Sequence, residues 1–330
     1  MSAVTSPDGF QTTVVRMPAP GVPGDFAGAN IKANVIGGPG AWVAPPSGTL
    51  IGVMAYANPA TGYATNYFQP SSFQGFVHRE GQAIITPFLA FYGQQIPSGD
   101  MVTVMNFGEF WGLFEGGASI GNVVYANPVT GALSGGASGQ SVTVTGGAGT
   151  VSGSGVLTLT TAPSSGAYAV GQIVSMVGLP PGTYATAVTG SAVGDTITLA
   201  NADSATIPAV STATSFTAYG QQATPFTVLQ NVPSPATFTA SLAQPASGAA
   251  FGVLTVTAVA TGTIVPGQWI SATGLPAHSN TEILEQTSGT PGGAGDYLTT
   301  NTYYTIASTS SFQAVTGAVG KISSIVTAAN

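Results

Sequence analysis

The stretch GVLTLT at residues 155–160 alternates apolar residues with threonine. This two-residue period is typical of a β-strand that buries one side and exposes the other. The same alternation occurs at 102–105, 141–145, 196–199 and 252–257. No window of the sequence shows a 3.6-residue apolar stripe with helix caps. The sequence therefore predicts an all-β fold.

Glycine and proline separate these strands, and the 330 residues include 46 glycines and 23 prolines. Both residue types supply the backbone geometry of turns. The motif YANPxTG, at 56–62 and again at 125–131, predicts a hairpin turn. Strands at intervals of about 8–12 residues are typical of sandwiches and barrels. We therefore expect a barrel-like or sandwich domain.

GVLTLT also begins an internal repeat. Three blocks return in the same order: GVLTLT (155–160) as GVLTVT (252–257), GQIVS (171–175) as GQWIS (267–271), and GLP (178–180) as GLP (274–276). A gap of one residue aligns all three blocks. We interpret the repeat as two homologous small β-modules, at residues 146–213 and 237–310.

The N-terminal part of the chain differs from the modules in composition. Residues 1–145 hold two of the three tryptophans and three of the four basic residues, and we predict an N-terminal arm followed by a β-domain. Strand-like segments at 224–229 and 321–326 lie outside the modules, and we expect both to return to this domain. Segments near 214–236 and 311–330 would then complete it, with the modules inserted at exposed loops.

Residues 17–24, MPAPGVPG, cannot be helical, because proline fixes φ and restricts the residue before it. The segment favours an extended, polyproline-like path. It is either a solvated leader or an arm that lies on a neighbouring subunit. A stiff extended segment loses less entropy on docking than a flexible one.

Charge and cysteine usage exclude several classes of protein. The chain has 4 Lys and Arg against 11 Asp and Glu, a net charge of −7, and no cysteine. A basic face for nucleic acid is therefore excluded, as are disulfide scaffolds and thiolate metal sites. No apolar run is long enough to span a membrane, and the start, MSAVTSPDGF, has no signal-peptide pattern. We expect neither nucleic acid nor membrane as a partner.

GASIG at 117–121 fits the G-x-S-x-G pattern of a serine nucleophile, and Asp195 or Asp203 and then His278 follow in the required order. That motif needs a strand followed by a helix, and no helix is predicted after residue 121. We therefore predict that the protein is not an enzyme. A hydrolase or depolymerase is the alternative that the motif leaves open.

No cofactor or metal site is predicted, since His78 and His278 lie far apart in the sequence and no metal or phosphate-loop motif occurs. Asp195 and Asp203 are read as turn residues rather than calcium ligands. The aromatic residues of 107–114 could stack a sugar or a base, but a core or an interface is the commoner use. The densest ionisable segment is VHREG at 77–81, which predicts a local polar network or an intersubunit contact.

Several motifs together resemble the bacteriophage structural cement (capsid decoration) proteins. In chain order they are GVPGDFAGANIKANVIGGPG (21–40), GFVHRE (75–80), IIT (84–86), IPSG (96–99), GEFW (108–111) and VYAN (124–127). The resemblance covers about residues 10–133, with a short closing match at GKIS (320–323). The two modules exceed what a minimal cement protein needs.

The resemblance implies a non-enzymatic virion protein, made in the host cytoplasm, on the outer surface of the capsid. It would bind the major capsid protein and stabilise the head, as a homo-oligomer (dimer or trimer). By position, we expect the capsid or subunit contact at these residues: Arg16, Asp25, Phe26, Lys32, His78, Arg79 and Glu80.

The alternative function is a receptor- or glycan-binding phage fibre or adhesin. A fibre occupies a vertex or the tail in few copies, whereas cement covers the head. The readings overlap, because the modules could add weak contact with host-surface glycans to a cement role.

Overall fold

The fold is known from a computed structural model, which describes residues 21–37, 40–79, 94–136, 143–230, 232, 236–245, 251–266, 268–272, 275, 281–300, 304–315 and 318–324. All regular elements in these ranges are β-strands, so the all-β prediction is confirmed. Nothing in the described ranges forms a helix that is long and apolar enough to cross a membrane.

The N-terminal sheet has five strands in the order β1-β7-β5-β3-β4. Their bounds are Ala33–Asn34 (β1), Met54–Ala57 (β3), Ala64–Thr65 (β4), Phe73–Val77 (β5) and Val104–Phe107 (β7). A two-stranded sheet, β2 (Thr49–Leu50) with β6 (Gln95–Ile96), lies beside it. Trp42, Ile51, Val77 and Val104 belong to one buried cluster. β7 is the strand expected at 102–105, and it begins two residues later.

A closed five-stranded barrel, the central barrel, has the order β10-β8-β24-β17-β9. Its strands are Glu109–Phe114 (β8), Val123–Ala126 (β9), Leu133–Ser134 (β10), Gln222–Val228 (β17) and Ala318–Ser323 (β24). Successive residues of β8 alternate between half-buried and buried, as the two-residue period requires. Phe110, Phe226 and Ile322 share one core with Met54 and Phe76 of the N-terminal sheet.

β17 and β24 overlap the two segments that were expected to return to the N-terminal domain. They pair with each other, and with β9 and β8 respectively. We keep the division into an N-terminal domain with two inserted modules, predicted at residues 146–213 and 237–310, as a proposal. The barrel pairings support it. The strands of the modules extend beyond these bounds, to 144–219 and 236–315.

Two six-stranded units follow the repeat. The first module is a closed barrel, β11-β12-β15-β14-β13-β16; its strands are Val144–Val151 (β11), Val156–Thr161 (β12), Ile173–Met176 (β13), Thr183–Val188 (β14), Thr196–Asn201 (β15) and Val210–Tyr219 (β16). The second module has the order β20-β23-β18-β19-β22-β21; its strands are Ala236–Ala243 (β18), Gly252–Thr261 (β19), Trp269–Ala272 (β20), Ile283–Gln286 (β21), Gly295–Thr299 (β22) and Ile306–Val315 (β23). If the six strands of each module are numbered in sequence order, the first module reads 1-2-5-4-3-6. The second reads 3-6-1-2-5-4, which is the same cycle opened between strands 3 and 4.

A buried glutamine makes the same contacts in both modules. The side-chain oxygen of Gln172 accepts the backbone N–H of Ala169, and that of Gln268 accepts the N–H of Val265, both at 3.0 Å. The carbonyl of Gln172 accepts from Ala185 at 3.0 Å, and that of Gln268 accepts from Ile283 at 2.8 Å. These contacts explain why the glutamine recurs in the repeat.

The YANPxTG motifs form the two expected hairpin turns, between β3 and β4 and between β9 and β10. The side-chain oxygens of Asn58 and Asn127 each accept a backbone N–H two residues on, at 2.9 Å. Their carbonyls accept from Gly62 and Gly131, also at 2.9 Å.

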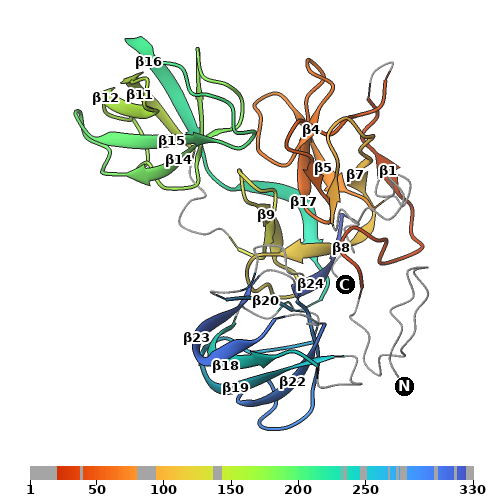
Figure 1. The fold of residues 1–330 in the computed structure, drawn as a ribbon. Coiled ribbons are helices and arrows are strands. Elements are labelled where there is room, and N and C mark those ends of the chain that lie inside the picture. Colours follow the sequence, from red (N-terminus) through yellow and green to blue (C-terminus); the bar gives the residue numbers. More distant parts are fainter. Residues whose placement is uncertain are drawn as a thin grey trace.

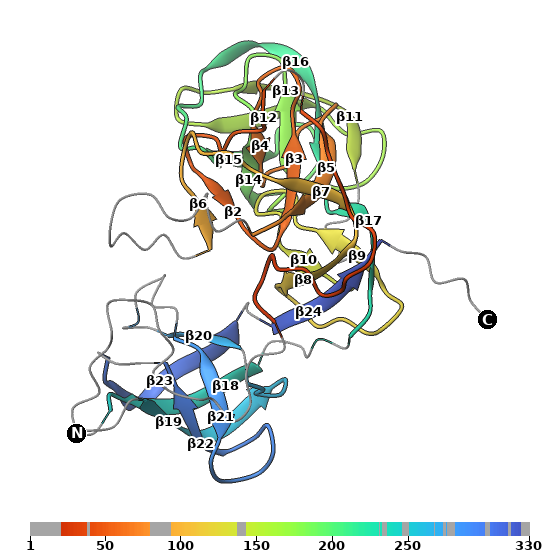
Figure 2. The same cartoon turned by 90° about the vertical axis from the view of Figure 1, so that its right-hand side faces the viewer.

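The central barrel lies between the other parts of the molecule (Figures 1 and 2). The first module lies beside the N-terminal sheet, whereas the second module lies on the opposite side of the barrel. Of the segment 17–24, predicted as a solvated leader or as an arm on a neighbouring subunit, residues 17–20 lie outside the described residues. Its described part, residues 21–24, lies on the chain's own β8, where the N–H of Gly24 donates to the Trp111 carbonyl.

Candidate functional site

A short segment crosses the surface of the central barrel and reaches the end of β5. The backbone N–H of Gly24 donates to the Trp111 carbonyl at 2.8 Å, and that of Trp111 donates to the Asp25 carbonyl at 3.0 Å. Phe26 forms a β-bridge with Phe110. Residues 24–27 are therefore fixed on β8 by backbone pairing.

Phe26 lies at the centre of an exposed aromatic stack. Its ring stacks on the imidazole of His78, with centroids 3.9 Å apart and an interplanar angle of 25°. The ammonium of Lys32 lies 3.8 Å from the centre of the same ring. Because both groups lie so close to one ring centre, they occupy its opposite faces. Phe26 is 36% exposed, so the edge of the stack faces solvent.

The carbonyl oxygen of Gly24 contacts both His78 and Arg79. The Nδ1 atom of His78 lies 2.7 Å from that oxygen, and the backbone N–H of Arg79 donates to it at 3.0 Å. A carbonyl only accepts, so Nδ1 carries the proton and the contact fixes the tautomer. The imidazole is thereby held in the plane that stacks on Phe26.

Asp25 and Arg79 form an ion pair at 3.8 Å beside the stack. The side chains are 41% and 40% exposed, respectively. Exposed pairs of this kind contribute roughly 0–1 kcal/mol to stability. Both charges therefore remain accessible to a partner.

We name this group of five side chains the Phe26 cluster: Asp25, Phe26, Lys32, His78 and Arg79. All five were predicted from the sequence as contact residues, and the structure brings them together. Arg16 and Glu80, the other two, lie outside the described residues. VHREG thus forms a polar network at least at His78 and Arg79.

Sequence reasoning gave no role to Glu109, whose carboxylate accepts the Asn30 side-chain amide at 2.9 Å beside the cluster. The only signal for it was its place in GEFW. Of the aromatic residues at 107–114, Phe110 and Phe114 lie in the core, and Trp111 is half-buried with Gly21 against its ring.

Ser119 does not form a nucleophile elbow. Its carbonyl accepts the N–H of Asn122 at 3.0 Å in a turn, and β9, a strand, follows directly. Asp195 closes a turn by accepting the N–H of Ala192 at 2.7 Å. His278 lies outside the described residues. Within the described part of the chain, no three metal-binding side chains gather.

Asp203 has a different role, at the contact between the first module and the N-terminal sheet. Its carboxylate accepts the Tyr67 hydroxyl at 2.7 Å and also the Ser47 hydroxyl. Burial, and then the hydrogen bond and charge of Asp203, raise the pKa of Tyr67 far above its ordinary value. Phe68 packs on Tyr219 nearby, at 4.8 Å between centroids. These contacts fix the first module on the sheet.

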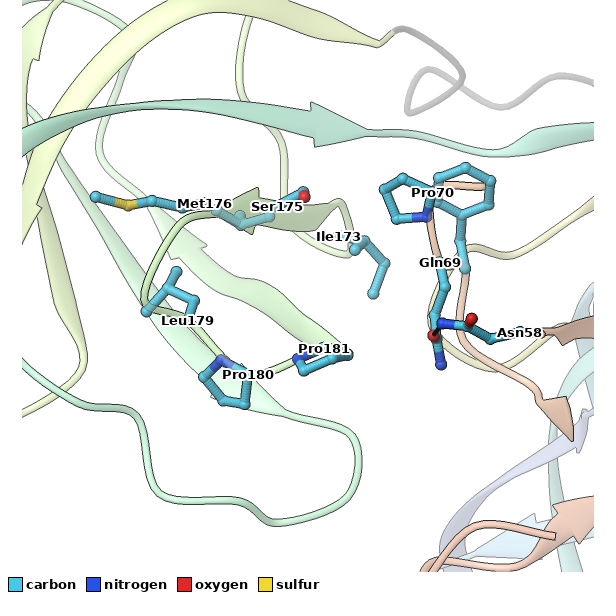
Figure 3. A pocket seen from close by; sticks show the side chains of 12 residues that line it. Asn58, Gln69, Pro70, Ile173, Ser175, Met176, Leu179, Pro180 and Pro181 are labelled. Atoms are coloured by element: carbon cyan, nitrogen blue, oxygen red, sulfur yellow. Dashed lines mark hydrogen bonds between the residues drawn. The ribbon is translucent and has the colours of Figure 1, made fainter. Parts of the chain in front are cut away.

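A pocket of about 280 Å³ lies at this contact (Figure 3). Asn58, Gln69 and Pro70 line one side, and the loop 179–182 with β13 lines the other. The amide of Asn58 donates to the Gln69 side-chain oxygen at 2.6 Å, so these polar groups already have partners within the chain.

Comparison of the sequence with known proteins gives a family match, which includes the Phe26 cluster. Residues 10–161 match the family model of the XM1 gp53 minor capsid protein. The match with this minor capsid protein covers the Phe26 cluster, the N-terminal sheet and the first strands of the first module. It supports a phage capsid-related family, and with it a structural virion protein. No curated protein matches the chain.

Proposed function

We propose that this chain is a capsid cement (decoration) protein that binds the outer face of the major capsid protein and stabilises the head without catalysis. The observation that carries the proposal is the Phe26 cluster. Five residues predicted as contacts lie together at the surface, within the region that matches a minor capsid protein.

The charges of the cluster indicate the kind of surface it would contact. The chain carries a net charge of −7, yet two of its four basic residues, Lys32 and Arg79, lie here. The acidic remainder of the molecule would repel an acidic or carbonyl-rich surface of the capsid, whereas the Phe26 cluster would attract it. The Phe26 ring adds apolar area to the same contact.

Stabilisation of the head would come from repetition. Each contact is small, but a protein that bridges neighbouring capsid subunits in symmetry-related copies gains from every additional contact. Such a protein needs shape and backbone rigidity rather than reactive groups. The closed barrel, the sheet and the first module docked through Asp203 supply shape and backbone pairing of this kind.

The test is co-sedimentation of the purified chain with mature capsids that lack it, with copies per particle counted on quantitative gels. Saturation at a copy number comparable to that of the major capsid protein supports cement. Saturation at the number of vertices or tails supports the alternative, a receptor- or glycan-binding fibre. Absence of binding overturns the capsid proposal.

A further inference from the structure

Among the described residues, β1 forms an open edge of the N-terminal sheet. It pairs with β7 on one side and is the last strand in the sheet order. The N–H of Val35, directly after β1, donates to the Val104 carbonyl at 2.7 Å. Backbone groups alternate in direction along an antiparallel strand, so those of Asn34 and Ile36 are directed away from β7.

The other edge of this sheet is covered. Both residues of β4 are buried, and Tyr67 and Phe68, which follow it, contact the first module. β1 is the strand of the sheet that lies farthest from the first module (Figure 1). The described part of the sheet thus has one covered and one open edge.

The open edge is also apolar. Ile31 and Ile36 flank β1 and are 81% and 82% exposed. Edge strands are usually protected against pairing by charges, prolines or covering segments. Lys32, directly before β1, is the nearest charged residue in the sequence, and its ammonium lies on the Phe26 ring. An uncovered edge between two exposed isoleucines is therefore suited to receive another strand.

The chain itself contains a segment suited to this edge. Residues 11–15, QTTVV, are rich in β-branched residues and favour a strand. They lie within the 20 residues that precede the described part. Extended at about 3.3 Å per residue, 20 residues reach roughly 66 Å, enough to contact a neighbouring molecule.

The path of the chain favours a second copy over the same copy. From Gly24 to Asn34 the segment runs antiparallel to the protein's own 111–105 region, and it reaches β1 only at its far end. The residues before Gly21 therefore start at the end remote from β1. Pro18 and Pro20 favour an extended path there rather than a reversal.

We propose that residues 11–15 of a second copy of this chain pair with β1 and add a strand to the N-terminal sheet. Each copy would donate one arm and receive one arm, so two copies that exchange arms reciprocally form a symmetric dimer, and three copies around a rotation axis form a trimer. The exchange deepens the proposed function, because it would connect neighbouring cement molecules on the head. Strand exchange is tested without capsids. The strand-exchange proposal can therefore fail while capsid binding is confirmed, and capsid binding can fail while strand exchange is confirmed.

The absence of native cysteine makes disulfide trapping specific. One full-length variant carries a single cysteine in the arm (Gln11→Cys, Thr13→Cys or Val15→Cys), and a second carries Asn34→Cys. After mixing and mild oxidation, we expect a covalent heterodimer from at least one arm position, because a disulfide requires Cα atoms about 4.4–6.8 Å apart. Val177→Cys, at a residue 83% exposed in the first module, replaces Asn34→Cys as the control.

Two outcomes overturn the proposal. One is cross-linking to Asn34→Cys no greater than to Val177→Cys at every arm position. The other concerns a third variant, which carries an arm cysteine and Asn34→Cys in the same chain. A disulfide that forms only within that chain would show that the arm covers its own β1.

Light scattering on full-length point variants provides a second test. Val14→Asp in the arm and Ile36→Asp at the edge should each weaken self-association at least tenfold, while Val177→Asp should not. Circular dichroism checks that each variant is folded. A monomeric wild-type chain, or folded arm and edge variants that associate like the wild type, would contradict strand exchange.

Discussion

The carbonyl oxygen of Gly24 accepts two hydrogen bonds, from the His78 ring and from the Arg79 backbone. One backbone atom thereby fixes both residues that face Phe26 and Asp25. Gly24 has φ +91°, and a Cβ at this position would contact Ile51 and Arg79. At the residue scale, the Phe26 cluster therefore depends on Gly24, which contributes only its backbone carbonyl.

We expect Gly24→Ala to lower the free energy of unfolding by about 2–4 kcal/mol, through left-handed backbone strain and overpacking. Gly99→Ala is the matched control, since Gly99 has φ +86° and open space around its Cβ position. It should cost only about 1–2 kcal/mol. Urea denaturation measures both, and equal losses would show that the contacts at Gly24 do not matter.

Lys32→Gln with Arg79→Gln should weaken capsid binding about tenfold or more and make the remaining binding less sensitive to salt. Both side chains are exposed, so the stability of the chain should change by less than about 0.5 kcal/mol. Co-sedimentation at two salt concentrations measures this. Val177→Gln, remote from the cluster, serves as the control, and unchanged binding by the double variant would remove the cluster from the interface.

At the scale of elements, the two modules share strand order but differ in their surroundings. The loop after β15 presents Asp203 to Tyr67 and Ser47 of the N-terminal region. In the second module, the carboxylate of Asp296 accepts hydrogen bonds from Thr255 and Ser288 of its own module. The first module thus uses an acidic turn residue for docking, whereas the second uses an acidic residue of strand β22 for local structure.

Asp203→Asn should loosen the contact between the first module and the sheet, because a neutral acceptor binds the Tyr67 hydroxyl less strongly. We expect amide hydrogen exchange in peptides spanning 64–69 and 201–205 to rise about 10-fold or more. Asp296→Asn is the control and should leave these peptides unchanged. Equal exchange in the wild type and Asp203→Asn would show that apolar packing alone holds the module.

Burial raises the pKa of the Glu282 carboxyl, just before β21, above its ordinary value of 4.5. The folded chain therefore binds this proton more tightly than the unfolded chain, and the gain is lost as pH rises through the raised value. Glu282→Gln should raise the Tm of the second module at pH 7 and give little difference at pH 3.5. Glu285→Gln controls for the change in net charge, and a benefit that grows on acidification would contradict this sign.

The strands were predictable from the sequence because alternation is local: GVLTLT and GVLTVT became β12 and β19. The barrel pairings are less accessible, because partners such as Gly108 and Ser324 lie far apart in the sequence. The Phe26 cluster was found only as separate motifs. Its assembly depends on the Gly24 carbonyl, and no side-chain pattern reports the position of a backbone atom.

At the scale of the whole molecule, the second module continues from two adjacent barrel strands. β17 and β24 pair through Thr227 and Ser323, and beyond them β18 and β23 pair through Ala236 and Ala314. The chain thus enters and leaves the second module through neighbouring positions. The barrel closes without any strand of that module.

Replacing residues 236–315 with a short Gly/Ser loop should therefore leave a folded chain that binds capsids with wild-type affinity. Circular dichroism and co-sedimentation measure the two properties. Permuting the order of the Gly and Ser residues in the loop controls for linker effects. A folded chain that no longer binds would place the second module in the capsid contact.

Side-by-side entry and exit make the second module a cassette. A gene segment encoding any small domain with adjacent ends could replace it by recombination while the barrel retains its strands. A phage lineage could then vary what it presents to its surroundings without changing how the protein attaches. Under the proposed cement function, the same position is where we would insert a foreign domain to display it in many copies on a virus particle.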